Sequence, residues 1–155
     1  MLMLVAAKQS EFDKGLILMR TNMSATLEAV GVPWDDEWNR THYLSLDNYS
    51  IFLKGQWIGF ISVEEVQDGL FVHTLQLAPE HQGNIYGLKI FQWLCARVFE
   101  CDKNFIRCRA IKGSSVVEQY FRLGFVVEST SGVLVSLALA LDKIGPMSAL
   151  RRKQK

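Results

Sequence analysis

The stretch from Leu75 to Leu88, LQLAPEHQGNIYGL, constrains the fold most, because the periodicity of the chain changes within it. The run Phe71–Leu77 alternates as a strand does, and this run stops at Pro79. From Leu88 onwards, apolar residues recur at helical spacing. The sequence therefore predicts a strand, a tight loop and a helix in direct succession.

This loop has the properties of an anion site. Its two glycines, Gly83 and Gly87, allow a ligand to approach the backbone closely. The start of the following helix offers N–H groups and the positive end of the helix dipole, which together favour a phosphate. The two glycines alone are equally consistent with a simple turn of the chain, so the loop by itself leaves both interpretations open.

Length and composition indicate one domain. The chain has 155 residues, of which 49% are apolar, and this suffices for one substantial core. We expect a single domain over residues 1–145 and a basic tail over residues 146–155. The formal net charge of +1 gives no reason to expect nucleic acid or a membrane surface as a partner.

Neither a metal site nor a secretory signal is predicted. The three cysteines have no C-x-x-C spacing and no nearby histidines, so the sequence supports neither a disulfide framework nor a metal centre. The opening residues 1–7 lack the basic region of a signal peptide. The cytoplasm is therefore the expected location.

Local signals place the elements before the loop. A strand is expected over Leu2–Ala7, followed by a helix that Ser10 caps and that ends near Gly31. Asp35 is expected to cap a second, short helix. Three strands joined by turns then lead into the loop: Tyr49–Leu53, Trp57–Val66 and Leu70–Leu77.

After the loop, a helix is expected over Gly87–Glu100 and a strand over Phe105–Ala110. Ser115 and Glu118 have capping-box spacing for a further helix, which Gly124 would end. Two strands would close the chain as a hairpin: Phe125–Ser129 and Val133–Leu141. This order predicts an α/β (α+β) fold, with a mixed, mostly antiparallel sheet of roughly six to seven strands flanked by about four helices.

Three groups of residues stand out together: the strand ending in Leu-Ala-Pro-Glu, the pair Gln82-Gly83 with Gly87, and Tyr120 four residues before Gly124. They are similar to motifs of the GNAT superfamily of acyl-CoA-dependent N-acetyltransferases. The element order also resembles the GNAT fold. The resemblance implies acetyl-CoA as co-substrate, with no metal.

The loop departs from the family at one position. The family motif is Q/R-x-x-G-x-G/A, and this chain has Ile85 at the fourth position, where glycine is usual. Because a β-branched residue disfavours positive φ, we expect Ile85 to hold a helical or extended backbone. We also expect its side chain to pack against the sheet or the following helix.

The resemblance implies where acetyl-CoA would bind. The pyrophosphate would lie on backbone N–H groups of residues 82–88, and the pantetheine arm would run along the end of the preceding strand like an added strand. The implied cofactor residues are Leu75, Gln76, Leu77, Gln82, Gly83, Asn84, Ile85, Tyr86, Gly87 and Leu88.

Tyr120 stands where the family has its tyrosine general acid. A phenol with a pKa of about 10 stays protonated at neutral pH and can give its proton to the departing thiolate. Without the resemblance, an amphipathic core tyrosine explains the residue as well. The family often has an asparagine seven residues before this tyrosine, where this chain has Gly113.

The general base and the acceptor site are less constrained. Candidate bases are Glu64, Glu65 and His73, each of which is also an ordinary strand or surface residue. The helical segment that covers the acceptor in this family has aromatic and acidic side chains, which suit a cationic amine. These are Trp34, Asp35, Trp38 and Tyr43, although a capped helix with apolar anchors explains them equally.

The leading hypothesis is a cytoplasmic N-acetyltransferase that moves an acetyl group from acetyl-CoA to a primary amine by direct attack in a ternary complex. The alternative is a non-catalytic acyl-CoA-binding or sensing domain with the same fold, motivated by Ile85 and Gly113. A third hypothesis is a structural or interaction domain whose loop binds no ligand. The acceptor amine, the formation of a homodimer and the role of the basic tail stay open.

Overall fold

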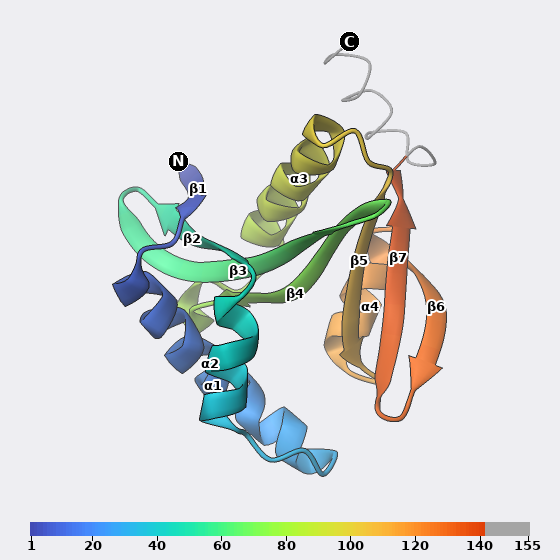
Figure 1. Ribbon diagram of the computed structural model, residues 1–155, viewed down its shortest axis with the longest axis horizontal. Coiled ribbons are helices and arrows are strands. Elements are labelled where there is room, and N and C mark those ends of the chain that lie inside the picture. The colour runs from blue at the N-terminus through green and yellow to red at the C-terminus, as the bar shows by residue number, and fades with distance from the viewer. Residues whose placement is uncertain (142–155) are drawn as a thin grey trace. The chain divides into compact units, whose positions relative to one another are not determined.

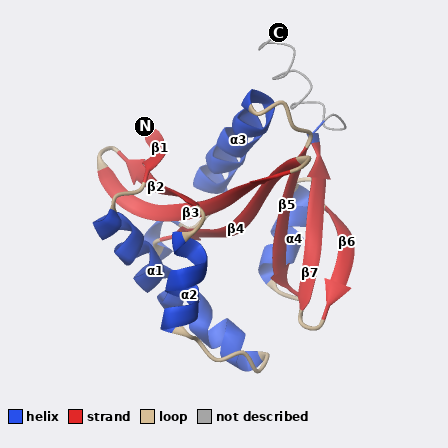
Figure 2. Ribbon diagram, in the orientation of Figure 1, coloured by secondary structure: helices blue, strands red, loops and turns tan. Residues whose placement is uncertain are grey.

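The computed structural model describes residues 1–141, and these form a mixed sheet flanked by helices (Figures 1 and 2). The elements are β1 (Leu2–Ala6), α1 (Gln9–Ala29), α2 (Asp36–Leu44), β2 (Asp47–Leu53), β3 (Gln56–Val66), β4 (Gly69–Leu77), the 3₁₀ turn η1 (Pro79–His81), α3 (Asn84–Glu100), β5 (Phe105–Ile111), α4 (Ser115–Arg122), β6 (Val126–Ser131) and β7 (Leu134–Ala140). The sheet has the strand order β1-β2-β3-β4-β5-β7-β6. The predicted α/β (α+β) fold is confirmed.

The chain divides into two compact units, each built from two segments. Unit 1 consists of Met1–Glu64 and His73–Lys89, and unit 2 consists of Glu65–Val72 and Ile90–Lys155. A single domain over residues 1–145 stays a prediction. The predicted basic tail, residues 146–155, lies outside the described residues.

The core of unit 1 forms where α1 packs on β3. Phe12, Leu16 and Met19 lie at helical spacing on α1 and are buried with Phe60 of β3. The partly buried side chains around this cluster come from α1, the α1–α2 connection, α2 and β3: Met23, Trp34, Tyr43 and Trp57. The apolar stripe of α1 therefore fixes the helix on the sheet of unit 1.

Turn and cap residues explain how the strands and helices of unit 1 begin and end. Lys54 and Gly55 have φ values of 52° and 80°, which fit the tight hairpin turn predicted between β2 and β3. Asp35 caps α2 as predicted, since its Oδ1 accepts from the Trp38 N–H at 2.9 Å. The predicted cap at Ser10 is wrong, because Lys8 is the N-cap of α1 and its N–H donates to Glu11 Oε1 at 3.0 Å.

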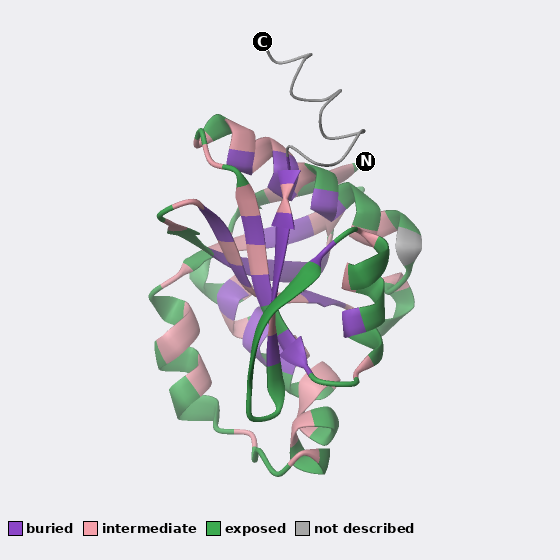
Figure 3. Ribbon diagram, turned by 90° about the vertical axis from the view of Figure 1, so that its right-hand side faces the viewer, coloured by how far each residue is buried: buried purple, intermediate pink, exposed green. Residues whose placement is uncertain are grey.

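In unit 2, β5 pairs in opposite senses with its two neighbours. Its register with Gly69–Val72 of β4 is parallel, and its register with β7 is antiparallel. β5 alternates as predicted, with buried Ile106, Cys108 and Ala110. The rings of Phe91 and Phe125 lie 6.3 Å apart and join α3 to this core. Figure 3 shows that buried residues concentrate in the strands of the sheet.

The helix α4 begins at Ser115, one residue earlier than predicted. Ser114, not Ser115, occupies the N-cap position, and its side chain makes no cap bond. Leu123 is the C-cap and Gly124 follows with a φ of 101°, a conformation that glycine adopts without strain. The predicted C-terminal glycine of this helix is therefore confirmed.

The close approach of the backbone at Gly59 predicts that alanine is not tolerated there. An added Cβ would lie 2.1 Å from the Gln76 carbonyl oxygen. We expect Gly59→Ala to lower the free energy of unfolding by about 1–3 kcal/mol, as overpacking does. At Gly87, by contrast, an added Cβ meets no atom within 4 Å and the residue is helical.

Gly87→Ala is therefore the matched control, and we expect it to be neutral or stabilising by up to about 1 kcal/mol. Urea denaturation followed by circular dichroism measures both variants. Equal stabilities of Gly59→Ala and the wild type would contradict the close approach of β3 to the end of β4.

Candidate functional site

The predicted anion loop is shorter than the sequence indicated, because α3 begins at Asn84 rather than at Gly87. The N–H of Gly87 donates to the Gly83 carbonyl at 3.4 Å. The N–H groups of Asn84, Ile85 and Tyr86 therefore precede the hydrogen-bond ladder of the helix. Together with the positive end of the α3 dipole, these groups favour an anion such as a phosphate.

The two glycines leave space beside this helix start. An added Cβ at Gly83 or at Gly87 would meet no atom within 4 Å. Gly83 has a φ of 154°, a conformation that side chains rarely adopt. The backbone is thus open at both positions, which fits the close approach of a pyrophosphate.

Ile85 confirms one expectation and corrects another. Its backbone is helical, as its β-branched side chain predicts. The predicted packing against the sheet or the following helix is wrong, because the residue is 69% exposed. A helical residue requires no positive φ, so isoleucine fits the fourth motif position in this chain without backbone strain.

Side-chain amides hold the end of β4 immediately before the loop. The Leu77 carbonyl accepts from Asn22 Nδ2 and from Gln82 Nε2, both at 3.1 Å. Asn22 Nδ2 also donates to Gln76 Oε1 at 2.9 Å, and Gln76 Nε2 donates to the Thr74 hydroxyl at 2.9 Å. The predicted cofactor residues Gln76, Leu77 and Gln82 thus lie together in unit 1.

Asn22 is a positioning residue that sequence reasoning missed. It lies within α1, and its partner Leu77 is 55 residues away in the sequence, so no local pattern connects them. The remaining predicted loop residues are more exposed. The rings of Tyr86 and His81 meet edge to face at 5.8 Å, and Leu88 is 49% exposed.

Two of the predicted bases, Glu64 and His73, are hydrogen bonded to each other. His73 Nε2 lies 2.9 Å from Glu64 Oε1, and His73 Nδ1 lies 3.2 Å from His42 Nε2. His42 comes from α2, His73 from β4 and Glu64 from β3. The sequence indicated no role for His42, because 31 residues separate it from His73.

The third predicted base, Glu65, belongs to unit 2 and lies 3.7 Å from Lys103 Nζ. The same ammonium donates to the carbonyl oxygens of Val66 and Gln67 at 2.9 and 2.8 Å. Glu65 is therefore part of a structural ion pair in unit 2.

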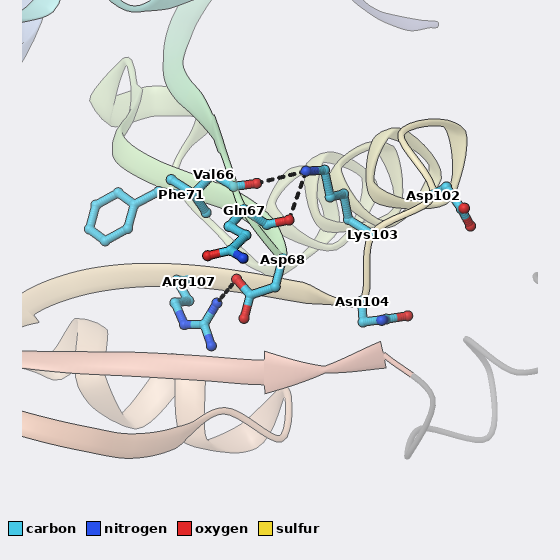
Figure 4. A pocket seen from close by; sticks show the side chains of 8 residues that line it. All are labelled: Val66, Gln67, Asp68, Phe71, Asp102, Lys103, Asn104 and Arg107. Carbon is cyan, nitrogen blue, oxygen red and sulfur yellow. Dashed lines mark hydrogen bonds and ion pairs between the residues drawn. The ribbon is translucent and has the colours of Figure 1, made fainter.

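Unit 2 also contains an open cavity of about 740 Å³, shown in Figure 4. Its cationic groups contact protein acceptors. Lys103 bonds two carbonyls, and Arg107 bonds Asp68 and Glu128, with Nε 2.9 Å from Glu128 Oε1. None of the predicted site residues lines this cavity, so it carries no functional assignment.

Tyr120 of α4 directs its hydroxyl to the Cys108 thiol of β5. Tyr120 is half-buried, and its ring meets Phe125 edge to face at 4.9 Å. Burial raises the pKa of Tyr120, and Cys108 raises it further. Burial raises the pKa of Cys108 to about 12, although the hydrogen bond from Tyr120 opposes this. Tyr120 is thus a protonated hydrogen-bond donor at neutral pH.

The four predicted acceptor residues differ in exposure. Trp34 and Tyr43 pack against the core cluster of unit 1, and burial raises the pKa of Tyr43. Asp35 caps α2. Trp38 is 59% exposed, and its ring stacks on His42 with centroids 4.8 Å apart and an interplanar angle of 14°. Trp38 is therefore the predicted acceptor residue best placed to meet a ligand from solvent.

Over residues 1–141, none of the helices has the length and apolar character needed to cross a membrane. In the same part of the chain, no three His, Cys, Asp or Glu side chains are grouped so as to hold a metal ion.

The network at Leu77 predicts unequal effects of removing its two amide donors. Gln76 is only 6% exposed, so Asn22→Ala leaves its buried Oε1 without this donor. We expect Asn22→Ala to lower the free energy of unfolding by about 1–3 kcal/mol. Gln82 is exposed, and after Gln82→Ala the Leu77 carbonyl still accepts from Asn22, so we expect a smaller loss. Urea denaturation measures both variants, and a larger loss for Gln82→Ala would contradict the network.

No protein-family model matches the chain, and no curated protein matches it in sequence. Solved structures do match its fold. One is the PaiA N-acetyltransferase from Thermoplasma acidophilum in complex with coenzyme A, at 15% identity and a TM-score of 0.71, covering 90% of this chain and 99% of that one.

A second is the spermidine N-acetyltransferase from Vibrio cholerae in complex with CoA and spermine, at 15% identity and a TM-score of 0.66, covering 92% of this chain and 96% of that one. A third is a GNAT-family acetyltransferase from Listeria monocytogenes, at 16% identity and a TM-score of 0.67, covering 90% of this chain and 95% of that one. At this level of sequence identity, structural similarity establishes the fold alone. The chain therefore has the fold of the GNAT N-acetyltransferases.

Proposed function

We propose that the chain is an N-acetyltransferase that moves an acetyl group from acetyl-CoA to a primary amine by direct attack in a ternary complex. The observation that carries the proposal is the open start of α3 at Gly83 and Gly87, directly after the end of β4 in a GNAT fold. The similar structures from T. acidophilum and V. cholerae hold coenzyme A, the second together with spermine, which supports this chemistry.

In this proposal the pyrophosphate of acetyl-CoA binds the N–H groups at the start of α3. The pantetheine arm runs along Leu75–Leu77, which continue β4 beyond Val72, the last residue in the parallel register with β5. Asn22 and Gln82 fix the Leu77 carbonyl and thereby the direction of the strand end. Binding thus depends mainly on main-chain groups.

The reaction moves two protons in opposite directions. The amine nitrogen attacks the acetyl carbonyl carbon, the carbon–sulfur bond breaks, one proton leaves the amine and one reaches the CoA sulfur. Glu64 and His73 form the basic pair in this proposal, because they are hydrogen bonded to each other, whereas Glu65 pairs with Lys103. In this proposal Trp38 meets a cationic amine through its exposed ring, and the other residues of the acceptor site are Trp34, Asp35 and Tyr43.

Tyr120 serves the leaving group in this proposal. Its pKa is raised, so complete proton transfer to a thiolate, whose own pKa is about 8.5, is energetically uphill. A neutral hydroxyl that donates a hydrogen bond to the sulfur as negative charge develops avoids that cost, and the departing thiolate then takes its proton from water. For this role the hydroxyl exchanges the Cys108 thiol for the CoA sulfur as its acceptor.

The contact between Tyr120 and Cys108 also favours a second candidate function, a non-catalytic acyl-CoA-binding domain. In such a domain the hydroxyl would stay with Cys108. Calorimetry with acetyl-CoA tests binding, and release of free thiol with spermine and a panel of primary amines tests transfer. Binding without thiol release supports the second candidate, and absence of binding contradicts both.

Ile85 allows a direct test of the main-chain binding site. Ile85→Pro removes one N–H that precedes the ladder of α3, and the first turn of a helix tolerates proline. Because a hydrogen bond to a charged group contributes about 1.5–3 kcal/mol, we expect Ile85→Pro to weaken acetyl-CoA binding by about tenfold to a hundredfold.

Ile85→Ala is the matched control, because it shortens the same exposed side chain and keeps the N–H. We expect its affinity for acetyl-CoA to stay near that of the wild type in calorimetry. Equal affinities of the proline and alanine variants would show that this N–H does not contact the ligand.

Removing the Tyr120 hydroxyl tests its role at the leaving group. We expect Tyr120→Phe to lower kcat by about ten- to ten-thousand-fold and to leave acetyl-CoA affinity unchanged, because the hydroxyl acts on charge that develops in the transition state. Steady-state thiol release and calorimetry measure the two quantities. Unchanged kcat in Tyr120→Phe would remove this role.

A further inference from the structure

We infer that Arg109 of β5 binds a carboxylate group of the acceptor, so that the acceptor is an amine that also carries a carboxylate, as amino acids do. This inference rests on the proposed function and deepens it, because it names the chemical class of the acceptor. Ser136 of β7 lies beside Arg109 and offers a further hydrogen-bond donor to the same carboxylate.

Arg109 lies on the open face of β5. Successive side chains of a strand point to opposite faces of the sheet, so Arg109 points away from the side that holds its neighbours Cys108 and Ala110. These two neighbours are buried, whereas Arg109 is exposed. The guanidinium group of Arg109 is therefore accessible from solvent.

Small side chains leave space beside Arg109. Arg109 is the register partner of Ser136 on β7, and Ser136 is the register partner of Ser129 on β6. Directly paired residues of antiparallel strands point to the same face, with their Cβ atoms about 5 Å apart. Figure 1 shows β5, β7 and β6 next to one another. Within residues 1–141 neither serine hydroxyl has a protein partner, so both can meet a ligand.

The two arginines of β5 differ in their partners. Arg107 contacts Asp68 and also Glu128, with its Nε 2.9 Å from Glu128 Oε1. Arg109 instead lies over the ring of Phe71, with Cζ 5.1 Å from the ring centroid, and none of the described carboxylates pairs with it. A guanidinium that stacks on a ring keeps its N–H groups at its edge, where they can bind a carboxylate in a bidentate manner. Arg109 is thus a held cation whose charge no described carboxylate balances.

The charges on this face favour a monoanion. Arg107 with Asp68 and Glu128 has one positive and two negative charges, which leaves a net charge of −1 about two residues, or about 7 Å, from Arg109. A carboxylate balances the single charge of Arg109. A phosphate dianion would add a second negative charge near Asp68 and Glu128, and a polyamine would bring a further cation towards Arg109. We therefore favour a carboxylate over both.

The carboxylate site and the group that serves the leaving sulfur belong to the same part of unit 2. Arg109 directly follows Cys108, which contacts the Tyr120 hydroxyl. Because Arg109 and Cys108 point to opposite faces of β5, a carboxylate at Arg109 does not compete with the CoA sulfur for the same space. One strand can thus serve both substrates of the proposed reaction.

The first experiment tests the site without any acetyl transfer. The ligand probe is N-acetylalanine, the product of transfer to alanine, and the control is its uncharged amide, both titrated at constant ionic strength. In NMR spectra of protein labelled with ¹⁵N in its arginine side chains, we expect a saturable shift of the Arg109 Nε–H signal with N-acetylalanine alone. We expect the Arg107 signal to stay, because carboxylates already hold that side chain. The absence of a shift at Arg109, or an equal shift with the amide, would overturn the inference.

The second experiment tests the use of the site in the reaction. The acceptor probes are ω-amino acids from glycine to 6-aminohexanoate, each compared with the alkylamine of the same chain length, with acetyl-CoA as donor. At the best length we expect kcat/KM to favour the amino acid by about tenfold to a hundredfold, as hydrogen bonds to a charged group do. We expect this ratio to fall to near one in Arg109→Ala and to stay at the wild-type value in the control Arg122→Ala, which removes an exposed arginine of α4. Comparison of the ratio between variants cancels differences in amine basicity.

A ratio near one at every length in the wild type, or an unchanged ratio in Arg109→Ala, would overturn the inference. Faster transfer to O-phosphoethanolamine than to β-alanine would show that the site selects a phosphate instead. If the wild type transfers acetyl to none of these amines, the proposed function fails and the acceptor role of Arg109 fails with it. The NMR titration still decides whether Arg109 binds a carboxylate, so the two failures are distinguishable.

Discussion

The hydrogen bonds to the Leu77 carbonyl hold together the part of the molecule on which the proposed function depends. A carbonyl at the end of a strand needs a partner, and this one accepts from Asn22 of α1 and from Gln82 of the loop. α1 is itself fixed to β3 by its buried apolar stripe. The core of unit 1 therefore sets the direction of β4 and the place where α3 begins.

The start of α3 explains why a departure from the family motif is compatible with the fold. Glycine at the fourth position is needed where the loop requires positive φ or the closest approach of a ligand. In this chain the helix already includes that position, and the Ile85 side chain is exposed. The N–H groups that precede the helical ladder are the same groups that the motif would provide. In the proposed function, the open space at Gly83 and Gly87 gives the ligand access to these groups.

Sequence reasoning predicted the elements that depend on neighbouring residues. Lys54-Gly55 and Gly124 take the positive φ values that their turns require, and the alternation in β5 matches its burial. It misplaced the cap of α1, because Lys8 is not a preferred N-cap residue, and the cap of α4, because Ser114 and Ser115 are equally suitable. It missed the pairing of His42 with His73 and the anchoring by Asn22, because these contacts span 31 and 55 residues and have no local signal.

The proposed reaction needs one group that takes a proton from the amine and another that keeps its proton beside the leaving sulfur. The structure gives these two groups different surroundings. Tyr120 keeps its proton because burial raises its pKa and Cys108 raises it further, so raising the pH towards about 10 does not remove it as it would in a solvated tyrosine. His42 instead contacts His73, which contacts the exposed carboxylate of Glu64 and so connects to water. Proton removal from the amine is thus coupled to solvent, whereas stabilisation of the leaving sulfur is not.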